Sequence, residues 1–251
     1  MKINWNPWHG CNKVSSGCDN CLLYQKDSSY GKDASQIYKV RDKFDYPLQK
    51  YKTGKWKIPS GSEISVCVSS DFFLEEADAW RGDAWGMIRE RKDLLFIIET
   101  KRASRVVENL PADWGFGYEN VCITVSVEDQ ATADERVPAL LGLPALMKGI
   151  VVSPILGEVN LVKYLSTGEI KSVSVGGESG IRGRVCNYDW VVSLHEQCAT
   201  YGVNFNFSQT GSTFLRGGKE YKISMLKEAD QAERSGLNSR PGRPWDAMQM
   251  F

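Results

Sequence analysis

The feature that most constrains this chain is a series of short, apolar, β-rich runs that recur along it. Their first residues are separated by 21 to 33 positions, and helix-like segments at 75–91, 131–141 and 188–201 lie between several of them. Near-continuous apolar strands alternating with helices favour parallel pairing, with helices covering the sheet faces. The runs span 64–68, 94–98, 121–127, 149–152, 170–175 and 203–207, and 3–5 is a further candidate strand.

Six or seven βα units at this spacing predict an α/β fold, a parallel partial TIM-like barrel. A flat doubly wound sheet is the alternative, because spacing alone does not distinguish the two. The length of 251 residues accommodates one barrel. We expect the barrel to occupy residues 1–211 with an insertion at 22–61, and residues 212–251 to form a C-terminal extension.

Composition excludes several classes of protein. The chain is 42% hydrophobic and 25% charged, which is typical of a globular protein and not of a disordered or fibrous one. Its 31 basic and 31 acidic residues balance, so a basic field over the whole molecule is absent, although a local patch remains possible. The sequence has no apolar stretch long enough to span a membrane and no signal-peptide core at its N-terminus. We therefore expect a cytoplasmic protein with no membrane partner.

The cysteines are unevenly distributed. Cys11, Cys18 and Cys21 form a C-x6-C-x2-C pattern in a segment rich in glycine, serine and asparagine, which predicts a loop able to wrap an ion or cluster. A closed zinc site needs four ligands, and His9 is an awkward fourth because only one residue separates it from Cys11. Of the scattered cysteines, Cys67 and Cys122 lie in apolar runs and are expected to be small buried residues.

Three thiolates can hold a [4Fe–4S] cluster that leaves one iron open to a small molecule. A three-cysteine loop after the first strand of a partial barrel is the layout of radical S-adenosylmethionine enzymes. In those enzymes the open iron chelates S-adenosylmethionine and the cluster supplies an electron that cleaves it. The resulting 5′-deoxyadenosyl radical abstracts hydrogen from substrate. The expected cofactors are therefore a [4Fe–4S] cluster and S-adenosylmethionine, with an external electron donor of the flavodoxin or ferredoxin type.

Ordered motifs along most of the chain extend this interpretation. They lie at 5–21, 69–73, 100–102, 125–136, 154–157, 176–180, 189–191, 197–198 and 202–203. In these motifs the sequence resembles the phage Gp37/Gp68 (three-Cys-motif, DUF5131-type) family, regarded as radical S-adenosylmethionine enzyme-like. The resemblance implies radical S-adenosylmethionine chemistry but no particular substrate, and it implies a protein of a bacterial or phage-infected host cell. Leu22, Ser153 and Ser208 depart from the usual family pattern, and the last two lie where substrate is expected.

Polar residues follow each predicted strand, at the edge where parallel α/β proteins bind ligands. Ser70 and Asp71 are candidates for the amino group of S-adenosylmethionine, and Lys101 or Arg102 for its carboxylate. Ser126 and Glu128 are further cofactor-binding candidates, with Glu128 as an acceptor from the ribose. Glu178, in a glycine-rich turn, and Gln209 are the catalytic or substrate-binding candidates. The alternative for these positions is a salt bridge or a tight turn at the barrel rim.

The insertion has its own pattern. The segment 38–57 contains seven basic residues but only two aspartates, and five aromatic residues are interleaved with them. Such a pattern suits a phosphate backbone with stacked bases, whereas the alternative is a solvated loop whose aromatic residues pack on the barrel. We therefore expect a radical S-adenosylmethionine enzyme in nucleic-acid base modification, isomerisation or repair, with DNA or a nucleotide as partner. The alternatives are a non-enzymatic nucleic-acid-binding protein with a structural metal loop, or a radical enzyme acting on a small molecule or peptide.

Overall fold

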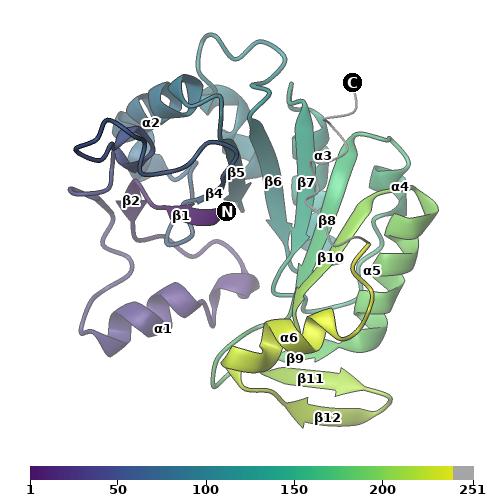
Figure 1. Ribbon diagram of the computed structural model, residues 1–251. Helices are drawn as coiled ribbons and strands as arrows, with labels where there is room; N and C mark the ends of the chain where they lie inside the picture. The colour runs from purple at the N-terminus through teal and green to yellow at the C-terminus, as the bar shows by residue number, and fades with distance from the viewer. Residues whose placement is uncertain (240–251) are drawn as a thin grey trace. The chain divides into compact units, whose positions relative to one another are not determined.

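The computed structural model describes residues 1–239 (Figure 1). The chain divides into two compact units. Unit 1 comprises residues 1–14, 23–125 and 142–147, and unit 2 comprises 15–22, 126–141 and the chain from 148 onward. Within the described residues, no helix is both long and apolar enough to cross a membrane. The part of the predicted extension at 240–251 lies outside the described residues.

Seven strands form one parallel sheet, in the order β1-β4-β5-β6-β7-β8-β10. This order follows the chain without the reversal that a doubly wound sheet requires, so the fold is the predicted α/β class, consistent with a partial TIM-like barrel. Each predicted run coincides with a strand. The strands are β1 (Lys2–Trp5), β4 (Glu63–Val66), β5 (Leu95–Thr100), β6 (Val121–Val127), β7 (Met147–Val152), β8 (Ile170–Gly176) and β10 (Asn204–Gln209).

Unit 1 is built around β1, β4 and β5, whose register pairs Trp5 with Val66 and Val66 with Ile98. All three residues are buried, and α2 (Asp78–Glu90) buries Ala84, Trp85 and Ile88 along one side. The insertion contributes α1 (Leu22–Ser29) and a short strand β3 (Tyr38–Lys39), which pairs antiparallel with β2 (Trp8–His9). Short 3-10 helices complete the unit at Tyr46–Leu48, Glu75–Ala77, Ala103–Arg105 and Val107–Asn109.

Unit 2 combines parallel strands with a small separate sheet. Strands β8 and β10 pair in parallel, and α3 (Gln130–Leu141), α4 (Val162–Leu165) and α5 (Tyr188–Thr200) belong to the same unit. The small sheet has the order β12 (Lys219–Lys222), β11 (Thr213–Arg216), β9 (Val185–Asn187). A 3-10 turn (Met225–Lys227) and α6 (Glu228–Glu233) follow, and α6 lies beside this sheet and packs on β10 (Figure 1).

The scattered cysteines are core residues. Cys67, Cys122, Cys186 and Cys198 are all buried, which confirms the prediction made for the first two. Burial raises the pKa of the Cys122, Cys186 and Cys198 thiols to about 12. These four side chains are therefore uncharged packing groups at neutral pH.

Candidate functional site

Asp71 organises the strand-end loops of unit 1. Its buried carboxylate accepts hydrogen bonds from four donors, which lie in the loop after β4, at the last residue of β5 and in the loop after β5. The donors are the Phe73 nitrogen (2.9 Å), the Thr100 hydroxyl (2.8 Å), the Lys101 nitrogen (3.0 Å) and Arg102 Nη1 (3.0 Å). Both carboxylate oxygens are therefore engaged within the protein, in holding the β5 loop and orienting Arg102.

Arg102 connects this carboxylate to the first cysteine. Its Nη1 lies 3.0 Å from Asp71 Oδ2 and 3.7 Å from Cys11 Sγ, and its Nη2 donates to the Asn12 carbonyl at 2.8 Å. Burial would lower the pKa of Arg102, but the charges of Asp71 and Cys11 raise it above its ordinary value. The guanidinium thus stays charged beside a sulfur atom, where it favours the thiolate. We call Cys11, Asp71 and Arg102 the Arg102 network.

Local backbone geometry brings these residues together. Gly10 has a φ of 92°, and a β-carbon there would press on the Gln36 and Ala34 carbonyls. A glycine is required at this close approach, which sets Cys11 N 2.8 Å from the Ala34 carbonyl. The Ser70 hydroxyl donates to the Gly10 carbonyl at 2.5 Å. The structure therefore brings Ser70, predicted from the sequence, against the cysteine segment of unit 1.

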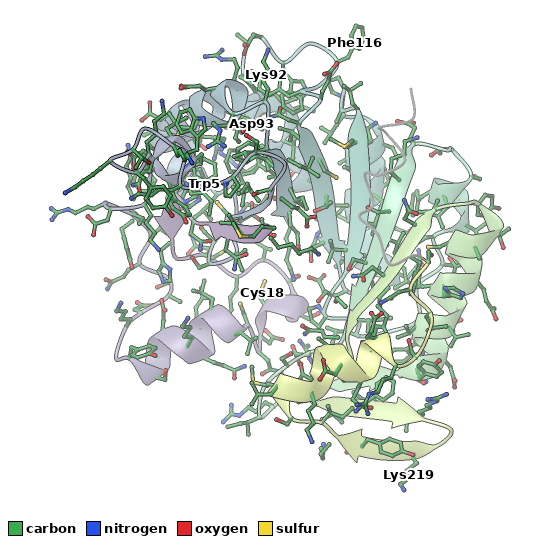
Figure 2. The ribbon with its side chains drawn as sticks, viewed as in Figure 1. Trp5, Cys18, Lys92, Asp93, Phe116 and Lys219 are labelled. Atoms are coloured by element: carbon green, nitrogen blue, oxygen red, sulfur yellow. The ribbon has the colours of Figure 1, made fainter. Side chains whose placement is uncertain are left out.

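The other two cysteines lie in unit 2, on the segment 15–22, which we call the cysteine loop. It contains a 3-10 turn (Ser16–Cys18), and Cys21 N donates to the Cys18 carbonyl at 3.3 Å. Figure 2 labels Cys18 on this segment, just before α1. The hydrogen bond between Cys21 and Cys18 links the backbones of the two cysteines.

Glu128 fixes one side of the cysteine loop. Its side chain is fully buried, and it accepts from the Ser15 hydroxyl at 2.8 Å and from Arg136 Nη1 at 3.1 Å. A β-carbon at Gly17 would overlap the Glu128 carboxylate, so the loop backbone lies directly on this group. Arg136 also donates to the Ser126 carbonyl at 2.7 Å. Glu128 therefore lies against the loop and is paired with an arginine of its own unit.

Glu178 and Arg184 fix the other side. Glu178 accepts from Arg184 at its backbone nitrogen (2.9 Å), Nε (2.8 Å) and Nη2 (2.5 Å), and from Asn20 Nδ2 at 3.0 Å. Arg184 Nη2 also donates to the Ser16 carbonyl at 2.8 Å. Burial would raise the pKa of Glu178, but the hydrogen bonds from Arg184 and Asn20 outweigh it and lower the pKa. This pair contacts the loop on both sides of Cys18 in the sequence.

The two remaining predicted residues have local partners in unit 2. The Ser126 hydroxyl donates to the Ser153 carbonyl at 3.1 Å. Gln209 Nε2 donates to the Gly177 carbonyl and the Ser179 hydroxyl, each at 2.8 Å. Ser179 in turn donates to Glu228, a buried carboxylate on α6 that also accepts from Ser212 at 2.6 Å. Gln209 thus holds the glycine-rich turn, and Ser179 joins that turn to α6.

The thiols suit a metal cluster in their chemistry. Cys11, Cys18 and Cys21 are half-buried free thiols, unlike the four buried ones, and Arg102 donates to one of them. Sulfur ligands favour iron–sulfur clusters and zinc. Within residues 1–239, no group of three or more histidine, cysteine or acidic side chains is placed to hold a metal ion. A cluster at these cysteines therefore stays a prediction from the three thiols and their spacing along the chain.

His9 has a set of partners that the sequence did not indicate. Its Nε2 lies 2.7 Å from Asp27 Oδ2, and its Nδ1 lies 3.1 Å from the Ser69 hydroxyl. Both ring nitrogens are therefore engaged within unit 1, which disfavours His9 as a fourth metal ligand. The antiparallel pairing of β2 with β3 also sets Tyr38 opposite His9, with ring centroids 5.3 Å apart.

His9, Ser69 and Tyr38 line a groove of about 750 Å³ in unit 1, which we call the insertion groove. Lys39, Arg41, Asp42, Lys43 and Tyr46 also line it. Lys39 pairs with Asp83 at 3.3 Å, and Lys43 lies 5.5 Å from the Tyr46 ring centroid. Arg41 has no side-chain partner within residues 1–239. The insertion groove is therefore lined by the Arg41 guanidinium, the Asp42 carboxylate and the Tyr38 ring.

Other parts of the basic and aromatic pattern serve packing. Lys50 and Arg91 both lie over the Trp56 ring, at 4.0 and 4.5 Å from its centroid. Trp5 Nε1 donates to the Phe44 carbonyl at 2.9 Å, which ties the insertion to β1. The insertion is thus partly the packed loop that was the alternative interpretation.

Strand order and strand-end residues together define a parallel α/β protein of the partial TIM-like barrel class with a three-cysteine motif near its N-terminus. The family model described as protein of unknown function (DUF5131) matches residues 1–248, and the chain belongs to this family. No curated protein matches the chain significantly. No solved structure does so either.

Proposed function

We propose that this protein is a radical S-adenosylmethionine enzyme whose Cys11, Cys18 and Cys21 bind a [4Fe–4S] cluster. When bound, the cluster and S-adenosylmethionine supply reductive cleavage of a sulfur–carbon bond and so hydrogen abstraction from substrate. The proposal takes its ligand set from the C-x6-C-x2-C spacing. An external donor of the flavodoxin or ferredoxin type would supply the electron.

One observation carries the proposal: acidic and basic side chains after the strands contact the cysteine segments in both units. In unit 1, Arg102 donates to Cys11 Sγ and is oriented by Asp71. In unit 2, Glu128 accepts from Ser15, at the start of the cysteine loop. The Arg102 guanidinium favours the anionic sulfur that a metal requires, and Glu128 positions the cysteine loop through Ser15. Lys101, Ser70 and Ser126 remain the candidates for contacts with S-adenosylmethionine, and Glu178 and Gln209 for contacts with substrate.

We further propose that the substrate of this enzyme is a nucleic acid. The insertion groove supports it, because Arg41 suits a phosphate and the Tyr38 ring suits a stacked base. Its volume of about 750 Å³ is within the range of small-molecule sites, so it has room for a nucleotide. Modification, isomerisation or repair of a base is the reaction class we propose.

The test is anaerobic purification and iron reconstitution of the full chain. We expect an absorbance band and an electron paramagnetic resonance signal of a reduced four-iron cluster that S-adenosylmethionine perturbs, with 5′-deoxyadenosine formed on reduction. Cys11→Ala, Cys18→Ala and Cys21→Ala should each lose the signal. Cys198→Ala, which removes a buried thiol in α5, is the matched control and should retain it.

A second candidate is a nucleic-acid-binding protein whose three cysteines hold a structural metal. It is favoured by the internal pairing of Asp71, Glu128 and Glu178, which are all engaged by arginines of the protein itself. This candidate predicts stoichiometric zinc and no response to S-adenosylmethionine in the same experiment. That result would contradict the radical enzyme.

A further inference from the structure

The C-terminal part of unit 2 contains a second basic pocket, away from the strand-end residues discussed above. It has a volume of about 580 Å³ and is lined by residues of β11, β12, α6 and their connections. Arg216, Lys222, Lys227 and Arg234 contribute four cationic groups, and no aspartate or glutamate lines it among the described residues. We call it the C-terminal pocket.

Within residues 1–239, one of the four cations has an acidic partner and the other three have none. Lys222 is neutralised by Glu220 at 2.9 Å, and Arg216 lies 4.5 Å from the Tyr188 ring centroid. Lys227 and Arg234 are exposed and have no side-chain partner within residues 1–239. Like charges that line one concave surface repel each other, so this pocket attracts anions. A bound anion would relieve that repulsion.

Aromatic rings accompany the charges. Tyr188 has Phe214 in an edge contact and the Arg216 guanidinium over its ring. Tyr221 lies on β12 and is 42% exposed. Figure 2 shows Lys219 on the same hairpin, and its Nζ lies 5.2 Å from the Tyr221 ring centroid. Cations beside accessible rings are the combination that binds single-stranded nucleic acids.

We propose that the C-terminal pocket binds the phosphodiester backbone of a single-stranded nucleic acid, with Lys227, Arg234 and Arg216 on the phosphates and Tyr221 stacked on a base. This inference rests on the nucleic-acid part of the proposed function and is independent of the cluster. Unlike the insertion groove, whose lining includes Asp42, this pocket has an entirely basic set of charged residues. It gives the protein a sequence-independent hold on a strand.

The test measures binding of a fluorescent oligothymidine of about 15 nucleotides to the iron-free full chain, at salt concentrations from about 50 to 200 mM. Each phosphate contact contributes about 0.7 to the slope of log affinity against log salt for single strands. The variant Lys227→Ala/Arg234→Ala should therefore reduce that slope by about 1.4. Lys92→Ala removes an exposed lysine of unit 1 and should leave it unchanged.

A second variant separates stacking from charge. Tyr221→Ala should weaken binding about fivefold or more with no change in the salt slope, because a stacked base contributes about 1–3 kcal/mol. Both side chains of the double variant are exposed, and circular dichroism verifies that each variant is folded. An unchanged slope in the double variant, or an equal loss in Lys92→Ala, would overturn the proposal.

Competition identifies the source of the phosphate. Unlabelled oligothymidine should displace the probe far better than thymidine monophosphate or inorganic phosphate, because several contacts act along one strand. Equal displacement by the mononucleotide would assign the pocket to a small phosphate ester and overturn the strand as its occupant. Formation of 5′-deoxyadenosine by reconstituted protein is measured separately, so failure of either proposal is recognised without the other.

Discussion

Replacing Glu128 by glutamine removes one charge from an ion pair that is closed to solvent. The side chains of Arg136 and Glu128 are 3% and 0% exposed, and among the described residues Arg136 Nε has no hydrogen-bond partner. Glu128→Gln leaves the shape almost unchanged but leaves a buried guanidinium without its counter-charge. Removal of one partner of a buried pair costs about 3–5 kcal/mol. We expect the free energy of unfolding of the cofactor-free protein to fall by that amount.

Asp113→Asn is the matched control, because it breaks an ion pair on the surface. Arg89 and Asp113 are 55% and 48% exposed, yet their 2.7 Å separation is shorter than the 3.1 Å between Arg136 and Glu128. An exposed pair contributes about 0–1 kcal/mol, so this variant should be nearly neutral. Distance alone predicts the opposite ranking of the two variants.

Urea unfolding followed by circular dichroism measures both variants at neutral pH. The double variant Glu128→Gln/Arg136→Met removes the stranded charge and should recover most of the stability lost by Glu128→Gln. If Glu128→Gln costs no more than Asp113→Asn, or if removing Arg136 as well brings no recovery, the buried charge is not the cause and the reasoning fails.

Three further predictions follow from the same structure. In the cofactor-free protein, iodoacetamide at neutral pH should alkylate Cys11, Cys18 and Cys21 but not the four buried thiols, as measured by peptide mass spectrometry. Burial raises the pKa of Cys122 to about 12, so alkylation of Cys122 would contradict this prediction. Gly17→Ala places a methyl group against Glu128, so the free energy of unfolding should fall by about 1–3 kcal/mol and iron uptake on reconstitution should fall as well. Gly168→Ala meets no described atom within 4 Å but has a positive φ, so it should lose stability and keep its iron uptake. Because the pKa of Glu178 is lowered in the folded state, its carboxylate stabilises the fold above the ordinary pKa of the carboxyl, and this stabilisation is lost as pH falls through the folded value. The difference in free energy of unfolding between the wild type and Glu178→Gln should therefore shrink from pH about 6 to about 3, and a constant difference would show that the charge does not stabilise the fold.

The barrel strands were predictable because they are buried. All seven residues of β6 are buried and five of them are apolar, and the run at 121–127 gives its bounds correctly. The helices α2, α3 and α5 were predicted within three residues at each end. Burial on both faces imposes a composition that can be read from the residues alone.

Other elements left no such signal. All four residues of β12 are exposed, and α1 buries only Asp27, so neither carries an apolar pattern. The sequence placed residues 212–251 in a C-terminal extension without predicting its elements, and the described part of this segment contains β11, β12 and α6, which belong to unit 2. These elements are held by pairing and hydrogen bonds, such as those from Ser179 and Ser212 to Glu228, which depend on the tertiary fold.

The strand-end residues were located from the sequence, but their partners were not. Parallel topology is enough to predict that Asp71 and Arg102 follow neighbouring strands at the same edge. It does not reveal that Arg184 pairs with Glu178, or that Asp27 and Ser69 contact His9. Arg184, Glu178 and Ser69 lie on irregular segments, and Asp27 lies on α1, which carries no apolar pattern. Irregular backbone has no periodicity from which a side-chain direction can be read.

The paired carboxylates bear on why the protein retains buried charges beside its cysteine segments. A buried ion pair gives little net stability relative to apolar residues of the same volume, because two charges must be removed from water. Two such pairs, Asp71–Arg102 and Glu128–Arg136, contact the cysteine segments directly. Arg102 donates to Cys11 Sγ, and Glu128 accepts from the Ser15 hydroxyl. Apolar replacements would preserve packing but could not direct hydrogen bonds to Cys11 Sγ or the Ser15 hydroxyl. Compared with apolar residues of the same volume, these charges therefore add positioning of the cysteine segments and little net stability.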